Sequence, residues 1–457
     1  MRIGLDFGTT HCGAAVYDGK RVRVLPLDPA SHDPTVIRST LYITREHEIT
    51  IGQEAVNTYY RQNTGRPSRM IRQYVGEIEM TVGEVGSVKG YPVGPSTFVR
   101  DVYVMVDELT PGQLLRSLKS ALSGSYEGTT IFGRYYELEE LIAIYLRELR
   151  SRIEAQLGQA VDGVVLGRPV HFVGGGQPQD DRRAEERLCS AAQRAGFHKI
   201  AFELEPVAAA LHYEQTVAVP QNVVVFDFGG GTLDITVVRV GEPGRRHVYA
   251  TGGLGIAGDD FDRRIIEGVM LDHFGRGSTW SDQGIPFPAY YTDALTDWQA
   301  LSELNRPETL RFLRQAQRTS SHPDQLRALE SLLVNNYAIC LIDEVEKAKI
   351  LLSTEHFGVI ELLGEDLAIW QPIARAQFET LIAQETHRIE ACLLDTVARS
   401  GLDIDEIDAL VRTGGSAQIP CVIEMMERIF GPERVVLSDV FNSVTAGLAI
   451  RASMDAI

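Results

Sequence analysis

Hydrophobic positions along the chain follow two spacings, which predict strands and helices in alternation. Short apolar runs rich in β-branched residues predict buried strands; they cover 3–7, 164–169, 200–204, 223–226, 235–240 and 409–411, with further strands at 21–25, within 39–51, at 98–106 and near 358–363. Apolar residues spaced three or four apart predict helices; these cover 138–157, 182–195, 207–213, 332–353, 373–398, 421–430 and 443–452, with a short helix from Gln113. Strands and helices in alternation predict an α/β fold.

The stretch 222–240 holds two of these strands around a glycine-rich turn. The strands flank the run Gly229-Gly230-Gly231-Thr232, with Asp227 before the run and Asp234 after it. Consecutive glycines let the backbone approach a ligand and point successive N–H groups inward, which makes a cradle for anions. A carboxylate at a strand end suits Mg²⁺, usually through the waters of the ion. Taken alone, the stretch fits an ordinary hairpin turn as well as it fits a phosphate site.

A second copy of this pattern lies at the start of the chain. Residues 3–16 give an apolar strand, then Asp6-Phe7-Gly8, the hydroxyls of Thr9 and Thr10, and apolar residues again. Asp6-Phe7-Gly8 repeats Asp227-Phe228-Gly229 about half a chain apart, and such self-similarity suggests two lobes built from one unit. Two hairpins that face each other across a cleft can clamp a polyphosphate and its metal ion.

Composition narrows the classes of partner. The 457 residues carry a net charge of −18, with 44% hydrophobic and 23% charged residues, as in ordinary globular proteins. Nucleic acid and anionic membranes need a basic surface, so we expect neither as a partner. The five cysteines include no C-x-x-C pair, and no signal peptide and no apolar run of about 18 residues is visible. We therefore expect a cytoplasmic protein.

Three stretches together carry a family resemblance: the two D-F-G hairpins, Leu204–Tyr213 (L-E-P-V-A-A-A-L-H-Y) and Glu346–Ser353 (E-K-A-K-I-L-L-S). The chain resembles the ATPase domain of the actin, sugar-kinase and heat-shock chaperone superfamily, most of all the DnaK-type heat-shock protein 70 branch and, within it, the short bacterial YegD-like proteins. The resemblance implies a duplicated ribonuclease-H-like, actin-like ATPase fold with ATP or ADP and Mg²⁺ between two lobes. It implies one lobe from 1–206, completed by a C-terminal helix in 440–457, and a second from 207–439 with a helical insertion at about 262–355.

The resemblance assigns the phosphate and metal residues. Asp6 and Asp227 correspond to ligands of metal-bound water. Backbone amides and hydroxyls at the phosphates correspond to Gly8, Thr9, Thr10, Gly229, Gly230, Gly231 and Thr232.

Three further residues are candidates for catalysis. Glu205, between a strand and a helix, would orient a nucleophilic water, and such positioning does most of the work in phosphoryl transfer; the alternative is that it only caps its helix. Asp234 would hold metal water or the attacking water, or else be a solvated strand residue. A lysine beside the transferred phosphate is implied by the family, and Lys119 is the nearest match, with Arg69 as its rival and an ordinary surface lysine as the alternative.

The adenosine end is marked by a helix and a loop. Glu346, Lys349 and Ser353 are spaced i, i+3 and i+7, hence on one helix face. The charge pattern alone would fit an exposed, salt-bridged face, whereas the resemblance implies contacts with ribose and adenine. It also implies backbone contact with adenosine at Gly414-Gly415-Ser416.

Two departures from the family pattern lie near this end. Gln418 stands where the family has an arginine that stacks on adenine, and it lacks a planar cationic face. Phe441-Asn442 replaces an acidic pair.

The length of two segments also departs from the chaperone pattern. After the last predicted helix the chain ends at Ile457, so we expect only the ATPase half, without the acidic linker, the β-rich peptide-binding domain and the helical lid. Between Lys119 and Leu138 we expect too little chain for the extra subdomain of the first lobe.

We therefore expect a Mg²⁺-dependent ATP-binding, slowly ATP-hydrolysing chaperone-like protein, whose lobes close on ATP and open on ADP. A protein partner such as an exchange factor is compatible with this reading, and the net charge favours a monomer. One alternative is a small-molecule kinase, which needs a carboxylate general base facing a substrate pocket. Another is a non-hydrolysing nucleotide-sensing or filament-forming actin-like protein.

Overall fold

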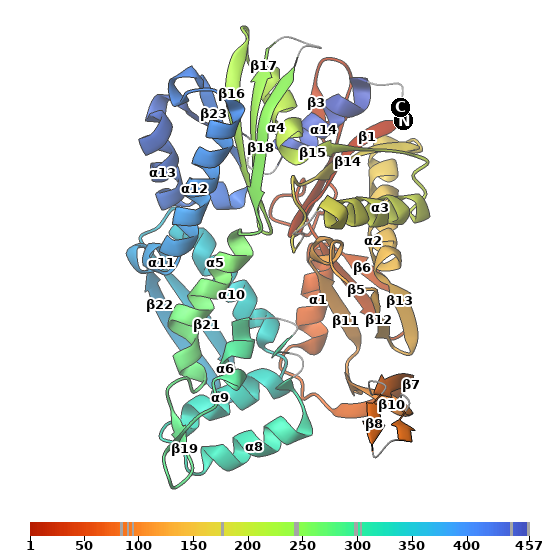
Figure 1. The fold of residues 1–457 in the computed structure, drawn as a ribbon, viewed down its shortest axis with the longest axis vertical. Coiled ribbons are helices and arrows are strands. Elements are labelled where there is room, and N and C mark those ends of the chain that lie inside the picture. The colour runs from red at the N-terminus through yellow and green to blue at the C-terminus, as the bar shows by residue number, and fades with distance from the viewer. Residues whose placement is uncertain are drawn as a thin grey trace.

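The computed structural model describes residues 1–82, 86–88, 91–93, 96–174, 178–241, 246–296, 300–301, 304–438 and 442–454. Two mixed sheets form the upper half of the molecule, and a smaller unit lies below each of them (Figure 1). No helix in these ranges combines the length and the apolar character that crossing a membrane would require.

The first sheet has the strand order β15-β14-β1-β2-β3, with β4 paired to β2. Its strands are β1 (Arg2–Phe7), β2 (His11–Tyr17), β3 (Val22–Val24), β4 (Ile37–Arg38), β14 (Gly163–Arg168) and β15 (Lys199–Leu204). Strands β1 and β2 form an antiparallel hairpin, whereas β14 and β15 run parallel to β1. Most residues of β1 and β14 are buried, as expected for strands of a sheet that has helices on both faces.

The second sheet has the order β24-β23-β16-β17-β18, which repeats the first sheet strand for strand. Its strands are β16 (Gln221–Phe228), β17 (Leu233–Val240), β18 (His247–Leu254), β23 (Ala409–Thr413) and β24 (Val435–Leu437). Again the first two strands form a hairpin and the last two run parallel to the first. The sequence repeat is therefore a structural repeat, and the predicted duplicated actin-like α/β fold is confirmed.

Helices α4 (Glu205–Glu214) and α14 (Ser443–Met454) pack against each other between the two sheets. One apolar cluster joins residues of both helices and both sheets, including Ala208, Val165, Val223 and Leu448. The approach is close at Gly447, where a Cβ atom would overlap the carbonyl oxygen of Ala208. The outer faces carry α2 (Leu138–Leu157) and α3 (Pro178–Arg194) on the first sheet and α12 (Ala383–Ser400) and α13 (Pro420–Phe430) on the second.

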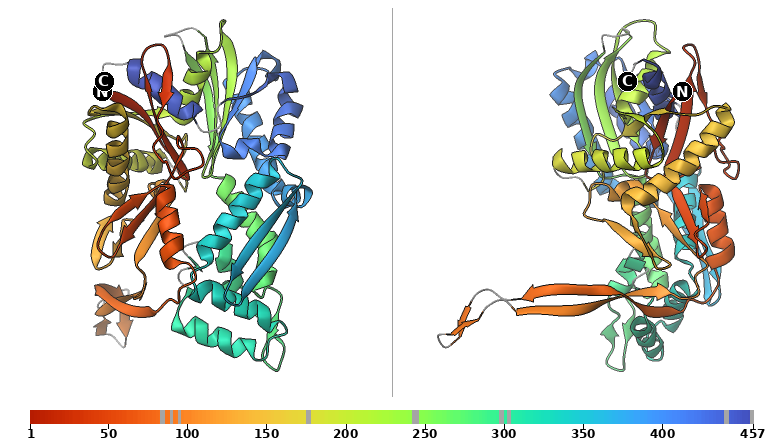
Figure 2. Two further views of the ribbon diagram at one scale, coloured as in Figure 1. Left: turned by 180° about the vertical axis from the view of Figure 1, so that it is seen from behind. Right: turned by 90° about the vertical axis from the view of Figure 1, so that its right-hand side faces the viewer.

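Below the first sheet lies a small unit of sheet and helix. It comprises β5 (Thr40–Thr44), β6 (Ile49–Ile51), α1 (Gln53–Asn63), β11 (Gly112–Arg116), β12 (Gly128–Ile131) and β13 (Arg134–Glu137). A β-arm, β7 (Met70–Val82) with β10 (Ser96–Asp107), projects away from the body and carries β8 (Gly86–Val88) and β9 (Tyr91–Val93) at its end (Figure 2). Between Lys119 and Leu138 only a 3₁₀ turn and the β12–β13 hairpin occur, so this unit draws most of its strands from residues before Lys119.

Below the second sheet lies a mainly helical unit. It comprises α5 (Gly258–Ile265), α6 (Tyr290–Asp293), α8 (Pro307–Gln317), α9 (Pro323–Val334), α10 (Ala338–Leu352), β21 (Phe357–Gly364), β22 (Leu367–Ala374) and α11 (Arg375–Leu381), with the short pair β19 (Thr279–Trp280) and β20 (Ile285–Pro286). The expected limits of the two lobes stay predictions: position 206/207 falls within α4, and 439/440 lies outside the described residues.

Most predicted elements are confirmed, and three differ for identifiable reasons. The segment from Gln113 is strand β11, because it pairs with β5 instead of forming a helix. The single helix expected over 332–353 is two helices, α9 and α10, broken at Asn335–Tyr337 with Asn336 in the left-handed region at φ 57°. The helix expected over 373–398 begins only after β22, which pairs with β21 up to Ala374.

The contact between α4 and α14 yields a prediction about stability. In a helix interior Gly→Ala normally stabilises by about 1 kcal/mol, but at Gly447 the added methyl meets the backbone of α4. We expect Gly447→Ala to lower the free energy of unfolding by about 1–3 kcal/mol, as overpacking does, measured by urea denaturation. The control is Gly124→Ala, whose Cβ would have only ordinary contacts. A stabilised Gly447→Ala variant would contradict the packing described.

Candidate active site

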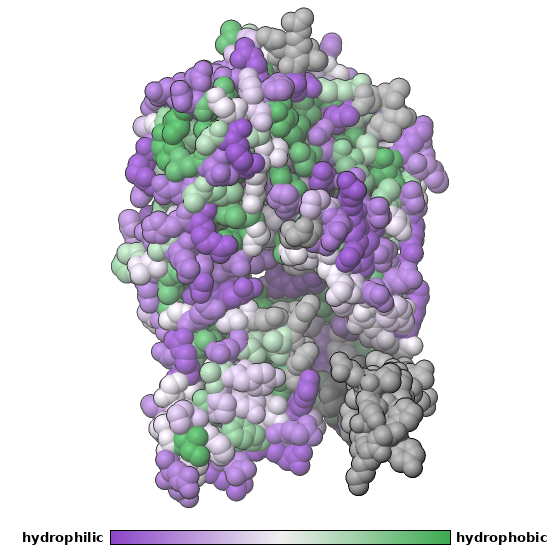
Figure 3. Space-filling view, in the orientation of Figure 1, coloured by the Kyte–Doolittle hydropathy of each residue, from purple (hydrophilic) through white to green (hydrophobic). Residues whose placement is uncertain are grey.

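The tips of the two hairpins meet at the centre of the molecule, where Figure 3 shows a hollow between the two halves with hydrophilic residues inside it. A Cβ atom at Gly230 would overlap the hydroxyl oxygen of Thr10, and one at Gly231 would lie 2.6 Å from Oγ1 of Thr9. A Cβ at Gly229 would meet nothing within 4 Å. Because the glycines of the second turn have no side chains, the two turns can approach each other, and space remains beside Gly229.

Polar groups around these turns are only partly satisfied within the chain. Oγ1 of Thr10 is buried and has no hydrogen-bond partner among the described residues. The amide of Gly229 donates to the carbonyl of Thr232 at 3.2 Å, so it closes its own turn. A buried hydroxyl without a partner is costly, and a phosphate oxygen would satisfy the hydroxyl of Thr10. Gly8 sits at the start of the first turn, where its carbonyl accepts from Oγ of Ser39 at 2.7 Å.

Carboxylates converge below the turns from three strands and a helix. Asp6 is the last residue but one of β1, Asp227 is the last but one of β16, and Asp234 lies directly opposite Asp227 on β17. In the first hairpin the residue opposite Asp6 is Gly13, so the second acid exists in only one copy of the repeat. Glu205, the first residue of α4, completes the group.

Burial and mutual repulsion disturb the pKa values of these acids. Burial, and then the charge of Glu205, raises the pKa of Asp6 and that of Asp234 to about 7 in each case. Burial, and then the charges of Glu205 and Asp234, raises the pKa of Asp227 well above its usual range. Too little positive charge lies near these carboxyl groups to stabilise all of them in the ionised form.

Lys119 supplies the positive charge of this group. Its Nζ donates to Oε1 of Glu205 at 2.5 Å, and both residues are buried, at 5% and 8% exposure. Burial opposes the charged form of Lys119, yet Glu205 and Asp6 hold its pKa above the usual value. The rival candidate, Arg69, instead forms an exposed ion pair with Glu108 at 3.1 Å. Asp234 is fixed by the N–H of Val170, which donates to Oδ1 at 2.5 Å.

The acidic group fits a hydrated cation better than a directly coordinated one. In the part of the chain that the structure describes, no three His, Cys, Asp or Glu side chains converge as a ligand set for a bare ion. Mg²⁺ keeps several waters in protein sites and binds through few carboxylates. Asp6 and Asp227, on opposite hairpins, could therefore hold the waters of such an ion.

The residues predicted for adenosine lie beside the second glycine turn. Nζ of Lys349 donates to Oδ2 of Asp262 at 2.6 Å and to the carbonyl of Gly258 at 2.9 Å. Oγ of Ser416 donates to the carbonyl of Gly229 at 2.7 Å. The same carbonyl accepts from the N–H of Gly258 at 3.2 Å. Helix α10, the loop after β23 and the second glycine turn thus meet at one point.

The other residues predicted near adenosine lie in the loop after β23, at the end of α10 and before α14. Gly414 has a φ of 87°, and a Cβ there would overlap the backbone of Phe228; Gly415 begins the 3₁₀ turn Gly415–Gln418. Nε2 of Gln418 is buried without a hydrogen-bond partner in the described residues. Ser353 follows α10 as its C-cap residue, and its N–H donates to the carbonyl of Ile350 at 3.0 Å. Phe441 lies outside the described residues, and Asn442 directly precedes α14.

Glu346 occupies the face of α10 that looks toward the first half of the chain. Its Oε2 atom lies 3.6 Å from Nη2 of Arg38 and is buried without a hydrogen-bond partner. Burial works against its ionisation, but Arg38, Lys349 and Arg116 together lower its pKa below the usual value. Glu346 is therefore an ionised acceptor with an unused oxygen, which suits a hydroxyl donor such as ribose.

Two acids near the site were not predicted as site residues. Asp259 lies close to Gly230 at the start of α5, and burial raises its pKa to about 6. Asp262, the partner of Lys349, has a pKa raised to about 7, also by burial. Both belong to Gly258-Asp259-Asp260-Phe261-Asp262, and the three acids that follow a glycine in this short stretch are the sequence signal that could have marked them.

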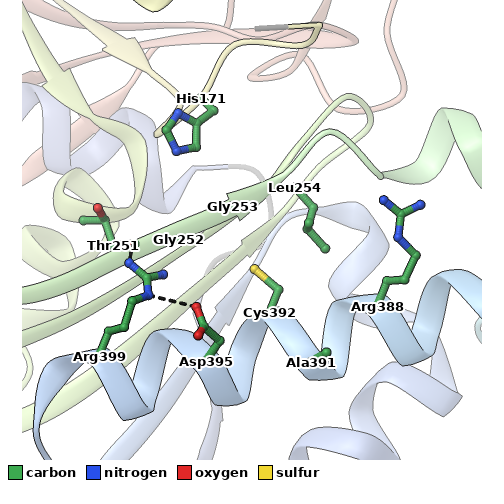
Figure 4. Close-up of a pocket in the computed structure, with 10 residues that line it drawn as sticks. All are labelled: His171, Thr251, Gly252, Gly253, Leu254, Arg388, Ala391, Cys392, Asp395 and Arg399. Carbon is green, nitrogen blue, oxygen red and sulfur yellow. Dashed lines mark hydrogen bonds and ion pairs between the residues drawn. The ribbon is translucent and has the colours of Figure 1, made fainter. Parts of the chain in front are cut away.

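A separate cavity of about 460 Å³ lies behind the acidic group. Figure 4 shows it between His171, residues Thr251–Leu254 of β18 and one face of α12. Gly253 in its wall pairs with Asp234 across β17 and β18, so one strand separates the cavity from the carboxylates.

Comparison with protein families gives one match. The family model described as Hsp70 protein matches residues 120–281 and 334–456, which together make up more than half of the chain. The matched ranges include Glu205, the second hairpin and the adenosine helix. The first hairpin and Lys119 lie before them, so their assignment rests on the repeat and on the contacts described above.

The lysine at the centre of the site yields a second prediction. Lys119→Met removes the positive charge that faces Glu205, Asp6 and Asp234 and leaves buried carboxylates without compensation. We expect the free energy of unfolding to fall by about 3–5 kcal/mol, as for other broken buried pairs, measured by urea denaturation at neutral pH. Arg69→Met, at an exposed pair, should change it by less than about 1 kcal/mol. Equal losses in the two variants would contradict the arrangement.

Proposed function

Because the chain belongs to the Hsp70 family, whose members have a nucleotide-binding, chaperone-like ATPase domain, we propose that it binds ATP together with Mg²⁺ between its two sheets and hydrolyses it slowly. The observation that carries this proposal is the meeting of two glycine turns over a buried acidic group that contains one lysine. The turns supply an anion cradle, and the carboxylates supply a place for a hydrated cation.

Unsatisfied groups support the placement of the nucleotide. The hydroxyl of Thr10 lies where a phosphate would bind, and Oε2 of Glu346 and Nε2 of Gln418 lie where ribose and adenine would bind. Each is a buried polar atom without a hydrogen-bond partner among the described residues, which is costly unless a ligand satisfies it. In this proposal Gln418 replaces stacking by an arginine with a hydrogen bond to the base.

The catalytic residues act by positioning. Glu205 accepts a hydrogen bond from Lys119 through Oε1, which leaves its other oxygen to orient a water toward the terminal phosphate. Lys119 is then close enough to that phosphate to stabilise charge that develops on it. Asp234, held by the N–H of Val170, accepts a hydrogen bond from the same water or from a water of the cation. Bound Mg²⁺ would neutralise phosphate charge and lower the pKa values of the surrounding acids.

Nucleotide titration by calorimetry tests the binding step. We expect ATP and ADP to bind in the presence of Mg²⁺, and Asp227→Asn to weaken this binding at least about tenfold, because the variant loses a charge that holds the hydrated ion. Asp395→Asn, at an exposed ion pair on α12, should bind as the wild type does. Equal binding by the wild type with and without EDTA would argue against the cation, and no binding at all would refute the proposal.

Single-turnover hydrolysis tests the chemical step. Glu205→Gln keeps the size of the side chain but cannot orient water as a carboxylate does. We expect the hydrolysis rate to fall by about a hundredfold or more, while the dissociation constant of ADP changes by less than about threefold. A parallel loss of binding would mean that Glu205 holds the site together and does not act on water.

A further inference from the structure

The turn that carries Lys119 is short and has a strained backbone. Lys119 lies in a 3₁₀ turn of four residues, Leu118–Ala121, and Ser117 before it has a φ of 53°, in the left-handed region that residues other than glycine seldom adopt. Such a conformation persists only where the surrounding structure holds it. The family match begins at residue 120, so it does not show how Lys119 is held in place. The support for this turn has to come from contacts made by the residues that follow it.

A single guanidinium group, that of Arg187 on α3, binds the segment 121–126. Its Nη2 atom donates to the carbonyl of Tyr126 at 2.8 Å. Its Nη1 atom lies within 3.5 Å of three further carbonyl oxygens, those of Ala121, Leu122 and Gly124. The N–H of Leu122 in turn donates to the carbonyl of Lys119 at 3.2 Å. One side chain therefore fixes the course of the chain directly after Lys119. We call residues 121–126 the Lys119 loop.

Glu139, in the first turn of α2, orients this guanidinium group. Nε of Arg187 donates to Oε1 of Glu139 at 2.5 Å, and the two side chains are 13% and 19% exposed. Burial opposes the ionisation of Glu139, but the hydrogen bond from Arg187 lowers its pKa below the usual value. The charged pair fixes the plane of the guanidinium group, so that its other two nitrogens point at the Lys119 loop.

Apolar packing holds only the inner side of the Lys119 loop. Leu122 is fully buried in the apolar core of the first half. The outer side of the loop instead borders a cavity of about 680 Å³, whose lining includes Arg183, Arg187 and Arg194. Nη1 of Arg183 makes longer contacts with the loop, the nearest being 3.4 Å from the carbonyl oxygen of Ser123. On this side the arginines of α3 take the place of apolar packing.

From these contacts we propose that Arg187 is a positioning residue for ATP hydrolysis, which fixes the Lys119 loop and thereby keeps the ammonium group of Lys119 on Glu205. This inference rests on the proposed function, which gives Lys119 and Glu205 their roles at the terminal phosphate. If the loop moves, the strained turn can relax and the buried ammonium group can move toward water, which solvates it better. The glycine turns of the two hairpins would stay in place, so nucleotide binding would be retained.

Hydrolysis in a single turnover and ADP binding, measured on the same variants, test the inference. Arg187→Lys keeps the positive charge, but an ammonium group donates from one point and cannot bond Glu139 and the loop together. We expect its hydrolysis rate to fall about tenfold or more, because small displacements of a catalytic group are costly, while the dissociation constant of ADP changes by less than about threefold. The matched control is Arg194→Lys, the same substitution on the same helix at an exposed pair with Glu137 (2.6 Å); it should hydrolyse ATP at the wild-type rate.

Acetylation of lysines by acetic anhydride, read by peptide mass spectrometry, measures the position of Lys119 without nucleotide. In the wild type, burial and the hydrogen bond to Glu205 should protect Lys119. We expect Lys119 to react about tenfold faster or more in Arg187→Lys, because local opening exposes its amine, and at the wild-type rate in Arg194→Lys. Glu139→Gln keeps Arg187 but removes the charge that orients it, so it should give a smaller increase.

The outcomes separate this inference from the proposed function. If the wild type hydrolyses ATP but Arg187→Lys does so within about twofold of its rate, or protects Lys119 equally well, the inference is wrong and the proposed function stands. If Arg187→Lys weakens ADP binding as much as hydrolysis, or Arg194→Lys has the same effects, the change is general destabilisation and the inference is also wrong. If the wild type binds no nucleotide, the proposed function fails first. Acetylation of Lys119 in the nucleotide-free variants then still decides whether Arg187 fixes the loop.

Discussion

The structure depends on holding several carboxylates together out of water with a single lysine among them. Charges in a low-dielectric interior are stable only when they are paired, and here the Lys119–Glu205 pair leaves Asp6, Asp227 and Asp234 with pKa values raised by burial. Two large apolar cores on either side hold this arrangement in place. A site that is already short of positive charge, and rigidly held, is organised in advance for a cation and for the phosphates that accompany it.

Duplication of the sheet and its hairpin accounts for the two glycine turns but not for the candidate catalytic residues. Two sheets of equal strand order bring equivalent hairpins to equivalent places, and the glycines at their tips allow contact. The groups suited to hydrolysis are not duplicated. Gly13 occupies in the first hairpin the position that Asp234 has in the second, Glu205 starts a helix that packs between the sheets, and Lys119 lies in a turn of the first half alone. The repeat therefore supplies binding symmetrically, while asymmetric positions supply the candidate catalytic residues.

Sequence reasoning succeeded where the signal is local. The strands around Asp6 and Asp227, and the strand–helix junction at Glu205, are marked by apolar runs, glycines and a proline within a few residues of each other. The same reasoning failed at β11, where pairing with β5 overrides a helical pattern, and at Asn335–Tyr337, where a contact with α1 breaks a helix. Asp343 of α10 contacts Tyr60 and Arg116, which lie far before it in the chain, so no short stretch of sequence could have indicated these contacts.

The two halves of the molecule are joined at two places, and the contacts at these places differ in their chemistry. Near the sheets, α4 and α14 meet in an apolar contact so close that Gly447 has no room for a methyl group. At the other end the contact is made largely by hydrogen bonds and ion pairs around Asp343. Separating an apolar contact exposes apolar surface to water and costs free energy. Polar groups that are separated can form hydrogen bonds with water instead. Any relative movement of the two halves should therefore turn about α4 and α14, where the apolar contact is closest.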